Sequence, residues 1–218
     1  MTEITADLLL KAYAYGVFPM AKSRADDKVF WVQPKFRGVI PLDHFHVSRS
    51  MRKTLRRGTF TVTCDAAFDA VLDLCAEPRP GREETWINSK IVELFVDLYN
   101  AGLAHSIETW RDGELVGGLY GLAMGAAFFG ESMFSRAENG SKVALCHLVG
   151  IMKRGGFMLL DTQFITDHLK RFGAIEIPQK DYLAQLSNAL SHHGEFGPPL
   201  TQRELDAALF SQASTQIS

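Results

Sequence analysis

Three polar residues of one glycine-rich block have types and a spacing suited to chemistry: Glu131, Asp161 and Gln163. Glu131 lies in the segment AAFFGESMFS, where a carboxylate among phenylalanines and methionines needs a polar partner once it is buried. Asp161 and Gln163 come near the end of the apolar run FMLLDTQF, and residues two apart in an extended strand face the same side. Because α/β sheets usually place ligands at the carboxyl ends of their strands, the three residues together predict a site.

Other interpretations of the same block are open or excluded. Glu131 could pair with Arg136 or Lys142, and Asp161 could cap the helix that follows it, because ion pairs are often purely structural. A serine-hydrolase nucleophile is excluded. The segment GESMF lacks the final glycine of G-x-S-x-G and lies inside a predicted strand instead of at a sharp turn.

Residues that could bind a metal are sparse. His44-x-His46 and Asp167-His168 are possible ligand pairs, but neither has a third ligand at a recognisable spacing. The three cysteines are widely separated and form no CxxC pair, which argues against a zinc ribbon or a disulfide framework. We therefore expect no metal.

A basic run predicts a second functional surface. Five cationic residues fall within nine positions: Arg49, Arg52, Lys53, Arg56 and Arg57. At helical spacing most of them share one face, and such a face can neutralise several phosphates of a nucleic acid. A solvated helix face is the equally ordinary alternative, since the net charge of the chain is only −2.

The elements that must position these residues alternate along the chain. A first helix should begin at Thr5, as N-cap, and end at Gly16, followed by a short hairpin or arm and a boundary at residues 34–37. Strands are predicted at 37–47, 60–65, 105–112, 114–125, 126–135 and 157–164, and helices at 48–57, 67–76, 88–102, 141–154 and 167–173. Ser141 should cap the fourth of those helices, and residues 174–190 combine a strand with a helix. The tail contains one capping box, Thr201 with Glu204, which predicts a last isolated helix.

This order predicts an α/β or α+β class with a mixed sheet. The 218 residues, with 46% hydrophobic and 22% charged side chains, are typical of a globular protein and exclude disorder or a coiled coil for the whole chain. No apolar run approaches the ~18 residues of a membrane span, and the N-terminus has no basic segment of a signal peptide, so a cytoplasmic protein is expected.

The strings GLYGLAMGAAFFGESMFSRAENGSK and LLDTQFITDHLKRFGAIEIPQKDYL resemble the leucyl/phenylalanyl-tRNA–protein transferase family. YAYGVFPM, SRSMRKTLRR and ETWI match the same family in the same order, so the resemblance covers roughly residues 5 to 190. It implies a small N-terminal domain or arm (1–36) and an acetyltransferase-like, GCN5-related catalytic domain (37–190). The C-terminal tail with its short helix (191–218) lies outside the resemblance.

The resemblance also implies a function. Members of the family move Leu or Phe, and less well Met, from aminoacyl-tRNA to proteins whose N-terminal residue is Arg or Lys, which marks those proteins for degradation in bacteria. No cofactor, metal or membrane is implied, and a monomer is expected. An acyl-CoA-dependent N-acetyltransferase and a non-catalytic RNA-binding module are the alternatives. The first is weakened because the segment RAENGS, residues 136–141, lacks the small residues of a pyrophosphate-binding loop.

The resemblance assigns roles to particular residues. Asp161, Gln163 and Glu131 match the catalytic site, and Trp86 matches a tryptophan that stacks the terminal adenosine. Some members have a second tryptophan where this chain has Met20, whose thioether can still pack against a base. The basic run becomes the expected contact to tRNA phosphates. The expected aminoacyl pocket comprises Leu119, Phe128, Leu145, Leu148 and Met152, although an apolar helical stripe such as the last three is more often plain core.

Overall fold

The computed structural model describes residues 4–78 and 83–211. The strands in these ranges are β1 (Phe18–Met20), β2 (Phe30–Val32), β3 (Phe36–Ile40), β4 (Thr61–Cys64), β5 (Ala104–Arg111), β6 (Glu114–Met124), β7 (Ala127–Ser135), β8 (Leu159–Gln163) and β9 (Ile175–Pro178). The helices are α1 (Ala6–Ala14), α2 (Arg49–Arg57), α3 (Phe68–Ala76), α4 (Ser89–Asn100), α5 (Gly140–Arg154), α6 (Asp167–Lys170), α7 (Gln179–Leu190) and α8 (Gln202–Phe210), with a 3-10 helix η1 (Leu42–His44).

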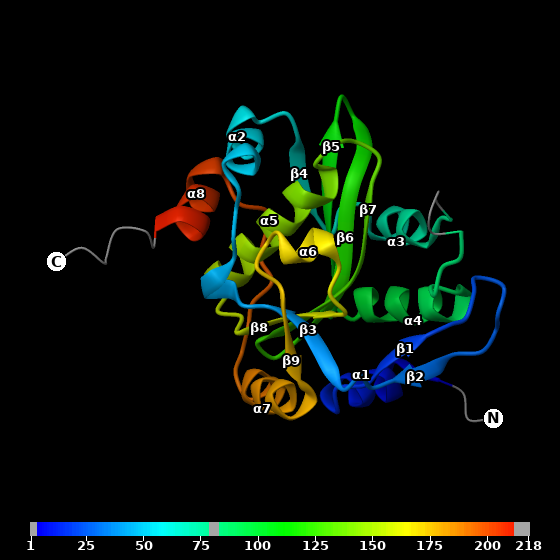
Figure 1. The fold of residues 1–218 in the computed structure, drawn as a ribbon. Helices are drawn as coiled ribbons and strands as arrows, with labels where there is room; N and C mark the ends of the chain where they lie inside the picture. The colour runs from blue at the N-terminus through cyan, green and yellow to red at the C-terminus, as the bar shows by residue number, and fades with distance from the viewer. Residues whose placement is uncertain (1–3, 79–82, 212–218) are drawn as a thin grey trace.

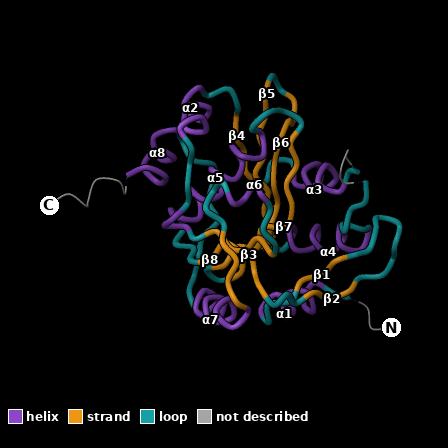
Figure 2. Tube along the Cα trace, in the orientation of Figure 1, coloured by secondary structure: helices purple, strands orange, loops and turns teal. Residues whose placement is uncertain are grey.

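Seven strands form one mixed sheet in the order β4-β5-β6-β7-β8-β3-β9 (Figures 1 and 2). All neighbouring pairs are antiparallel except β7 and β8, which run parallel because the crossover helix α5 joins them. The mixed sheet confirms the predicted class. The predicted strand at 37–47 is shorter than expected, because η1 follows β3.

Each face of the sheet is covered by its own group of helices (Figure 1). Buried residues of α1, α3, α4 and α7 form one hydrophobic cluster with the strands, and those of α2, α5, α6 and α8 form the other. α5 is buried almost all round, since every residue from Val143 to Met152 is buried. The sheet is therefore packed on both faces.

The N-terminal segment packs into the first of these clusters. Thr5 accepts a hydrogen bond from the N–H of Leu8 and caps α1, and Gly16 ends the helix in the left-handed region at φ +74°, both as predicted. β1 and β2 pair as the expected hairpin. Tyr13 of α1 and Phe18 of β1 are buried in the same cluster as residues of β7 and α7, so this segment shares a core with the larger domain.

The last helix is not isolated, which corrects the prediction for the tail. α8 packs on α5, where Gly150 leaves room for the side chains of Leu200 and Leu205. The capping box of Thr201 and Glu204 is present as predicted. The capping signal located the helix, but the absent side chain at Gly150 provides its docking surface.

One local prediction about the crossover was wrong. Ser141 does not cap α5: the N-cap is Asn139 at φ +70°, and the hydroxyl of Ser135 instead accepts the N–H of Ser141 at 3.2 Å. A glycine of β6 packs directly against the same helix. A Cβ atom on Gly117 would meet Gly140 at 2.6 Å, so this glycine permits close packing of α5 on the sheet.

Candidate active site

A cavity of about 270 Å³ opens in the sheet where β7 and β8 separate. The two strands are paired only from Ala127↔Leu159 to Phe129↔Asp161, although β7 continues to Ser135. The cavity is lined by residues 130–133 of β7 and by Leu160, Thr162, Gln163 and Phe164 at and after the end of β8. Because these two parallel strands separate, the cavity lies between the two hydrophobic clusters. It is at the end of β8, where the sequence predicted a site.

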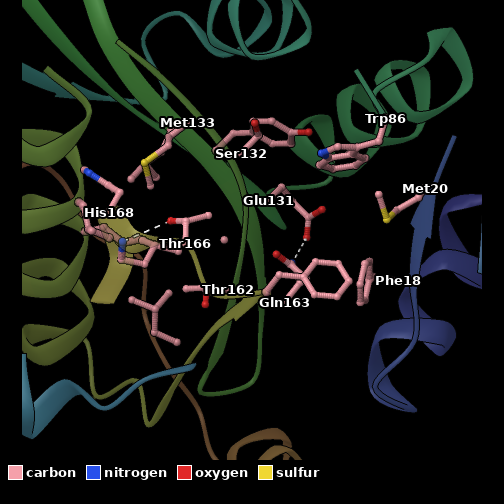
Figure 3. A pocket seen from close by; sticks show the side chains of 18 residues that line it. Phe18, Met20, Trp86, Glu131, Ser132, Met133, Thr162, Gln163, Thr166 and His168 are labelled. Carbon is pink, nitrogen blue, oxygen red and sulfur yellow. Dashed lines mark hydrogen bonds between the residues drawn. The ribbon is translucent and has the colours of Figure 1, made fainter. Parts of the chain in front are cut away.

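The cavity has two chemically different ends (Figure 3). Phe18, Met20 and Trp86 lie at one end, and Met133 and His168 at the other, with the Glu131–Gln163 pair between them. The structure thus brings the two residues expected to bind adenosine to one end of the same cavity. Apolar side chains of β6, β7, β8, α5 and α6 line much of the rest.

Glu131 and Gln163 form a buried hydrogen-bonded pair in the wall of the cavity. The side-chain Nε2 of Gln163 donates to Oε1 of Glu131 at 3.0 Å, and both residues are more than nine-tenths buried. This bond commits the amide group to Glu131, so the carbonyl oxygen of Gln163 remains free to accept a proton donor from a substrate. Neither Arg136 nor Lys142 pairs with Glu131: Arg136 binds Glu77, and Lys142 donates to Asn139.

The environment of Glu131 favours its protonated form. Burial raises its pKa from 4.5 to about 8, and the negative charge of Asp161 adds to this shift. The neighbouring hydroxyl of Tyr13, the charge of Arg37 and the amide of Gln163 act in the opposite direction. Glu131 is therefore a carboxyl group that can exchange a proton close to neutral pH.

Asp161 lies behind the cavity wall in a buried ion pair with Arg37. Nε and Nη2 of Arg37 donate to its carboxylate at distances of 2.7–3.1 Å, and Arg37 and Asp161 are 1% and 0% exposed. The hydroxyl of Tyr182 donates to the same carboxylate at 2.6 Å. Asp161 therefore does not cap the following helix, whose cap is Thr166, and it is not among the residues lining the cavity.

The backbone leaves the regular extended conformation at Gln163, the last residue of β8. Gln163 has φ +54°, in the left-handed region that residues other than glycine rarely adopt. Its N–H donates to Oδ1 of Asp161 at 2.8 Å, which supports that conformation. Gly38 on β3 permits the turn, since a Cβ there would lie 2.8 Å from the carbonyl carbon of Phe164. Asp161 thus fixes the backbone of Gln163, and Glu131 fixes its amide.

The expected aminoacyl pocket is present in part. Leu119, Leu145 and Leu148 line the cavity, but Phe128 and Met152 do not. Met152 lies one helical turn, about 6 Å, beyond Leu148 along α5 and is fully buried in the core. Phe128 lies in the part of β7 that is still paired with β8, and its ring stacks on that of Phe196 and meets that of Phe157 edge to face. Phe128 and Met152 lie outside the pocket for the same reason, because the cavity opens only where β7 and β8 separate.

Sequence reasoning missed several side chains of the cavity. Phe18, Met133, Leu160 and Leu169 add apolar surface, and His168, considered only as a metal ligand, lines the cavity as well. Within the described residues, Nε2 of His168 and Oγ1 of Thr162 are buried without a hydrogen-bond partner. The string DTQFITDH marked this stretch, but only the fold shows that Thr162 and His168 face one cavity.

The basic run forms the exposed face of α2, remote from the lining of the cavity. Met51 and Leu55 are buried, and all five cationic side chains surround one surface hollow. Arg52 and Arg56 also contact α8: the guanidinium carbon of Arg52 lies 3.9 Å from the ring centre of Phe210, and Nε of Arg56 lies 3.7 Å from Asp206. The tail helix therefore holds two of the five cations in place.

Two further findings concern the described residues alone. No group of three His, Cys, Asp or Glu side chains in residues 4–78 and 83–211 is arranged to hold a metal ion. No described helix is long and apolar enough to cross a membrane.

Comparison with known proteins identifies the family. A model of leucyl/phenylalanyl-tRNA protein transferases matches residues 39–187, and a model of their N-terminal domain matches residues 2–35. The leucyl/phenylalanyl-tRNA–protein transferase of Rhodospirillum rubrum is 60% identical over 196 residues, which cover 90% of this chain and 92% of that protein. The transferase of Paramagnetospirillum magneticum is 58% identical over 196 residues, 90% of this chain and 94% of its own length.

Two solved structures align less closely. L-PGS from Bacillus licheniformis has a TM-score of 0.43 at 14% identity, covering 75% of this chain and 55% of that one. The C-terminal domain of a putative lysylphosphatidylglycerol synthetase from Agrobacterium fabrum has a TM-score of 0.40 at 13% identity, covering 98% and 70%. The family matches span nearly the whole chain, and on that basis the chain belongs to the leucyl/phenylalanyl-tRNA–protein transferase family.

Proposed function

We propose that this chain transfers leucyl or phenylalanyl groups, and less well methionyl groups, from aminoacyl-tRNA to the α-amino group of proteins that begin with Arg or Lys. The product carries a bulky apolar N-terminal residue that marks it for degradation in the bacterial cytoplasm. The chain belongs to this family, and one observation on its structure supports the proposal. A single cavity is lined, from one end to the other, by an indole, a polar pair and an apolar wall. All of these groups come from one chain, so a monomer suffices.

The two ends of the cavity suit the two parts of the donor. The terminal adenosine lies against Trp86 and Met20, and the aminoacyl side chain lies among Leu119, Leu145 and Leu148. The ester that joins these parts is then beside Gln163, between the two ends (Figure 3). A largely apolar wall favours leucyl and phenylalanyl side chains, because a polar side chain would lose its hydration and meet few polar partners.

Holding the amine and the ester in attack geometry supplies most of the rate of transfer. The ester is already activated, and an α-amine has a pKa of roughly 7.7–8.0, so much of it is neutral near pH 7.5. The carbonyl oxygen of Gln163 accepts a hydrogen bond from the amine and directs its nitrogen to the ester carbon. The new amide bond forms as the ester bond to the ribose oxygen breaks, and the amine proton ends on that oxygen.

Glu131 assists this proton movement. Its pKa of about 8 is close to that of the incoming amine, so a proton can pass between them at little cost. In its charged form Glu131 also attracts an acceptor that carries a cationic Arg or Lys side chain. Asp161, held away from the cavity, is a positioning residue for Gln163.

A transfer assay tests the function directly. Wild-type protein is incubated with phenylalanyl-tRNA, leucyl-tRNA or acetyl-CoA and an Arg-initiated peptide, with an Asp-initiated peptide as the matched control. We expect transfer from both aminoacyl-tRNAs to the Arg-initiated peptide alone. Acetylation of the peptide would support the acyl-CoA alternative, and tRNA binding without transfer would support a binding module.

The start of α5 disfavours the acyl-CoA alternative. In acyl-CoA transferases of this fold the N–H groups before the central helix hold the pyrophosphate. Here the N–H of Gly140 is bonded to the carbonyl of Ala137 at 3.1 Å, and the N–H of Ser141 to the hydroxyl of Ser135. Those donors are already occupied within the chain.

Donor selectivity should respond to Leu148 and not to Met152. Leu148→Ala enlarges the cavity, so the ratio of kcat/KM for leucyl over tryptophanyl donors should fall about 5- to 50-fold, the effect of one or two methylene contacts. Met152→Ala should leave that ratio unchanged but lower the free energy of unfolding by about 2–5 kcal/mol, because the fully buried side chain leaves a void. A changed ratio in Met152→Ala would place the pocket deeper along α5.

The basic face of α2 should contribute to tRNA affinity through charge. Arg49, Lys53 and Arg57 are exposed, whereas Arg52 and Arg56 contact α8, so the first three can be changed to Ala without disturbing the tail helix. We expect weaker tRNA binding, with the slope of log K against log [salt] reduced by roughly 2–3.

Transfer from phenylalanyl-adenosine, which has no RNA beyond the site, should stay within about twofold in this triple variant. The double variant Lys11→Ala/Lys180→Ala, on exposed positions of α1 and α7, is the control and should keep the wild-type salt slope. An unchanged slope in the triple variant would mean that α2 is a solvated surface only.

A further inference from the structure

The β1–β2 hairpin carries a row of side chains out of the cavity. Phe18 and Met20 of β1 line the cavity, and the strand register pairs Met20 with Phe30 and Pro19 with Trp31. Directly paired residues of antiparallel strands share a face, with Cβ atoms about 4.5–5.5 Å apart. Phe30 therefore lies beside Met20 on the face turned to the cavity, and Trp31 lies on the reverse face.

Phe30 is the exposed member of this row. Its side chain is 42% exposed, whereas Phe18, further along the same face, is 3% exposed and belongs to the core. Phe30 does not line the cavity itself, so it is the aromatic ring next to Met20 just outside the cavity. Covering an exposed ring that continues a binding surface lowers the free energy, because aromatic surface in water is unfavourable.

We infer that Phe30 stacks the base of the nucleotide that precedes the terminal adenosine of the donor RNA. The inference rests on the proposed function, which places that adenosine on Trp86 and Met20. An RNA strand that leaves the cavity past Met20 next reaches Phe30, at about the spacing of adjacent side chains. Stacking on an aromatic ring suits any base, because every base has a π-face.

Charge contributes little at this place. The exposed charged residues of the loop between the two strands are Lys22, Arg24, Asp27 and Lys28, and Asp26 is partly buried with its carboxylate accepting the N–H of Lys28 at 2.9 Å. Three cations against two carboxylates leave a net charge near +1, too small for strong attraction of phosphates. The loss on removing Phe30 should therefore not change the salt dependence of binding, unlike the loss from the α2 variant.

The experiment compares three donors that differ only in the RNA: phenylalanyl-adenosine, the phenylalanyl ester of cytidylyl-adenosine, and phenylalanyl-tRNA. Phe30→Ala should lower kcat/KM for the second and third donors about 5- to 100-fold, mainly through KM, and leave the first within twofold. Phe30→Trp should restore the loss, since it again offers a ring. Trp31→Ala is the matched control, 38% exposed on the reverse face, and should leave all three donors within twofold.

Each contrary outcome identifies its cause. Equal loss with phenylalanyl-adenosine would show that Phe30 only supports Met20, and no loss with the dinucleotide donor would show that no base lies there; either result overturns the inference. If the wild-type protein transfers from none of the donors, the proposed function fails. Calorimetric binding of uncharged cytidylyl-adenosine against adenosine then still decides whether Phe30 adds affinity for the second nucleotide.

Discussion

Gln163→Ala should lower kcat for phenylalanyl transfer about 100- to 1,000-fold, the usual effect of removing one preorganised hydrogen-bonding group at the reacting atoms. The side-chain amide of Gln163 is committed to Glu131, which leaves its carbonyl oxygen as the group that can orient the amine. The measurement is the initial rate at saturating phenylalanyl-tRNA and Arg-initiated peptide.

Gln163→Met is the matched variant, because methionine fills nearly the same volume but accepts no strong hydrogen bond. It should lose about as much turnover as Gln163→Ala, and both should keep the wild-type tRNA affinity while losing about 1–3 kcal/mol of stability, because Glu131 loses a buried partner. The strained φ of +54° is present in all three proteins, so it does not distinguish them. Turnover near that of wild type in either variant would remove Gln163 from the mechanism.

Asp161→Ala should destabilise the protein by about 3–5 kcal/mol, because it leaves the guanidinium of Arg37 buried without its counter-charge. Arg37 would keep only its bond to the carbonyl of Gly16 at 3.1 Å and its contacts with the rings of Phe18 and Tyr182. The hydroxyl of Tyr182 would lose its acceptor as well. Urea unfolding followed by circular dichroism measures this free energy independently of activity.

A double-mutant cycle separates stability from catalysis. Asp161→Asn combined with Arg37→Met removes both charges, so the double variant should be less destabilised than the sum of the single changes, by about 1–3 kcal/mol. Its turnover should nevertheless stay low, because an amide is a weaker acceptor for the N–H of Gln163. Full stability of Asp161→Ala together with lost turnover would show instead that the carboxylate reaches the reacting atoms.

The sequence by itself determined the elements and the neighbourhood of the site. The caps at Thr5 and Thr201 and the left-handed end at Gly16 are local signals, and each operates where it was predicted. Hydrophobic periodicity located α4 and the strands around Glu131 for the same reason: within one element, neighbours in space are neighbours in sequence. The motifs of the family added which polar residues to consider.

Only the tertiary structure decided what those residues do. Arg37 lies 124 positions from Asp161, and no local pattern indicates that they pair. No sequence pattern indicates the left-handed backbone at Gln163, and of Asp161 and Gln163 only Gln163 lines the cavity. The parting of β7 and β8 admits Leu148 to the cavity and leaves Met152 in the core, although both belong to one apolar stripe. Burial, strand separation and contacts between distant segments depend on how elements pack, and packing is a property of the whole chain.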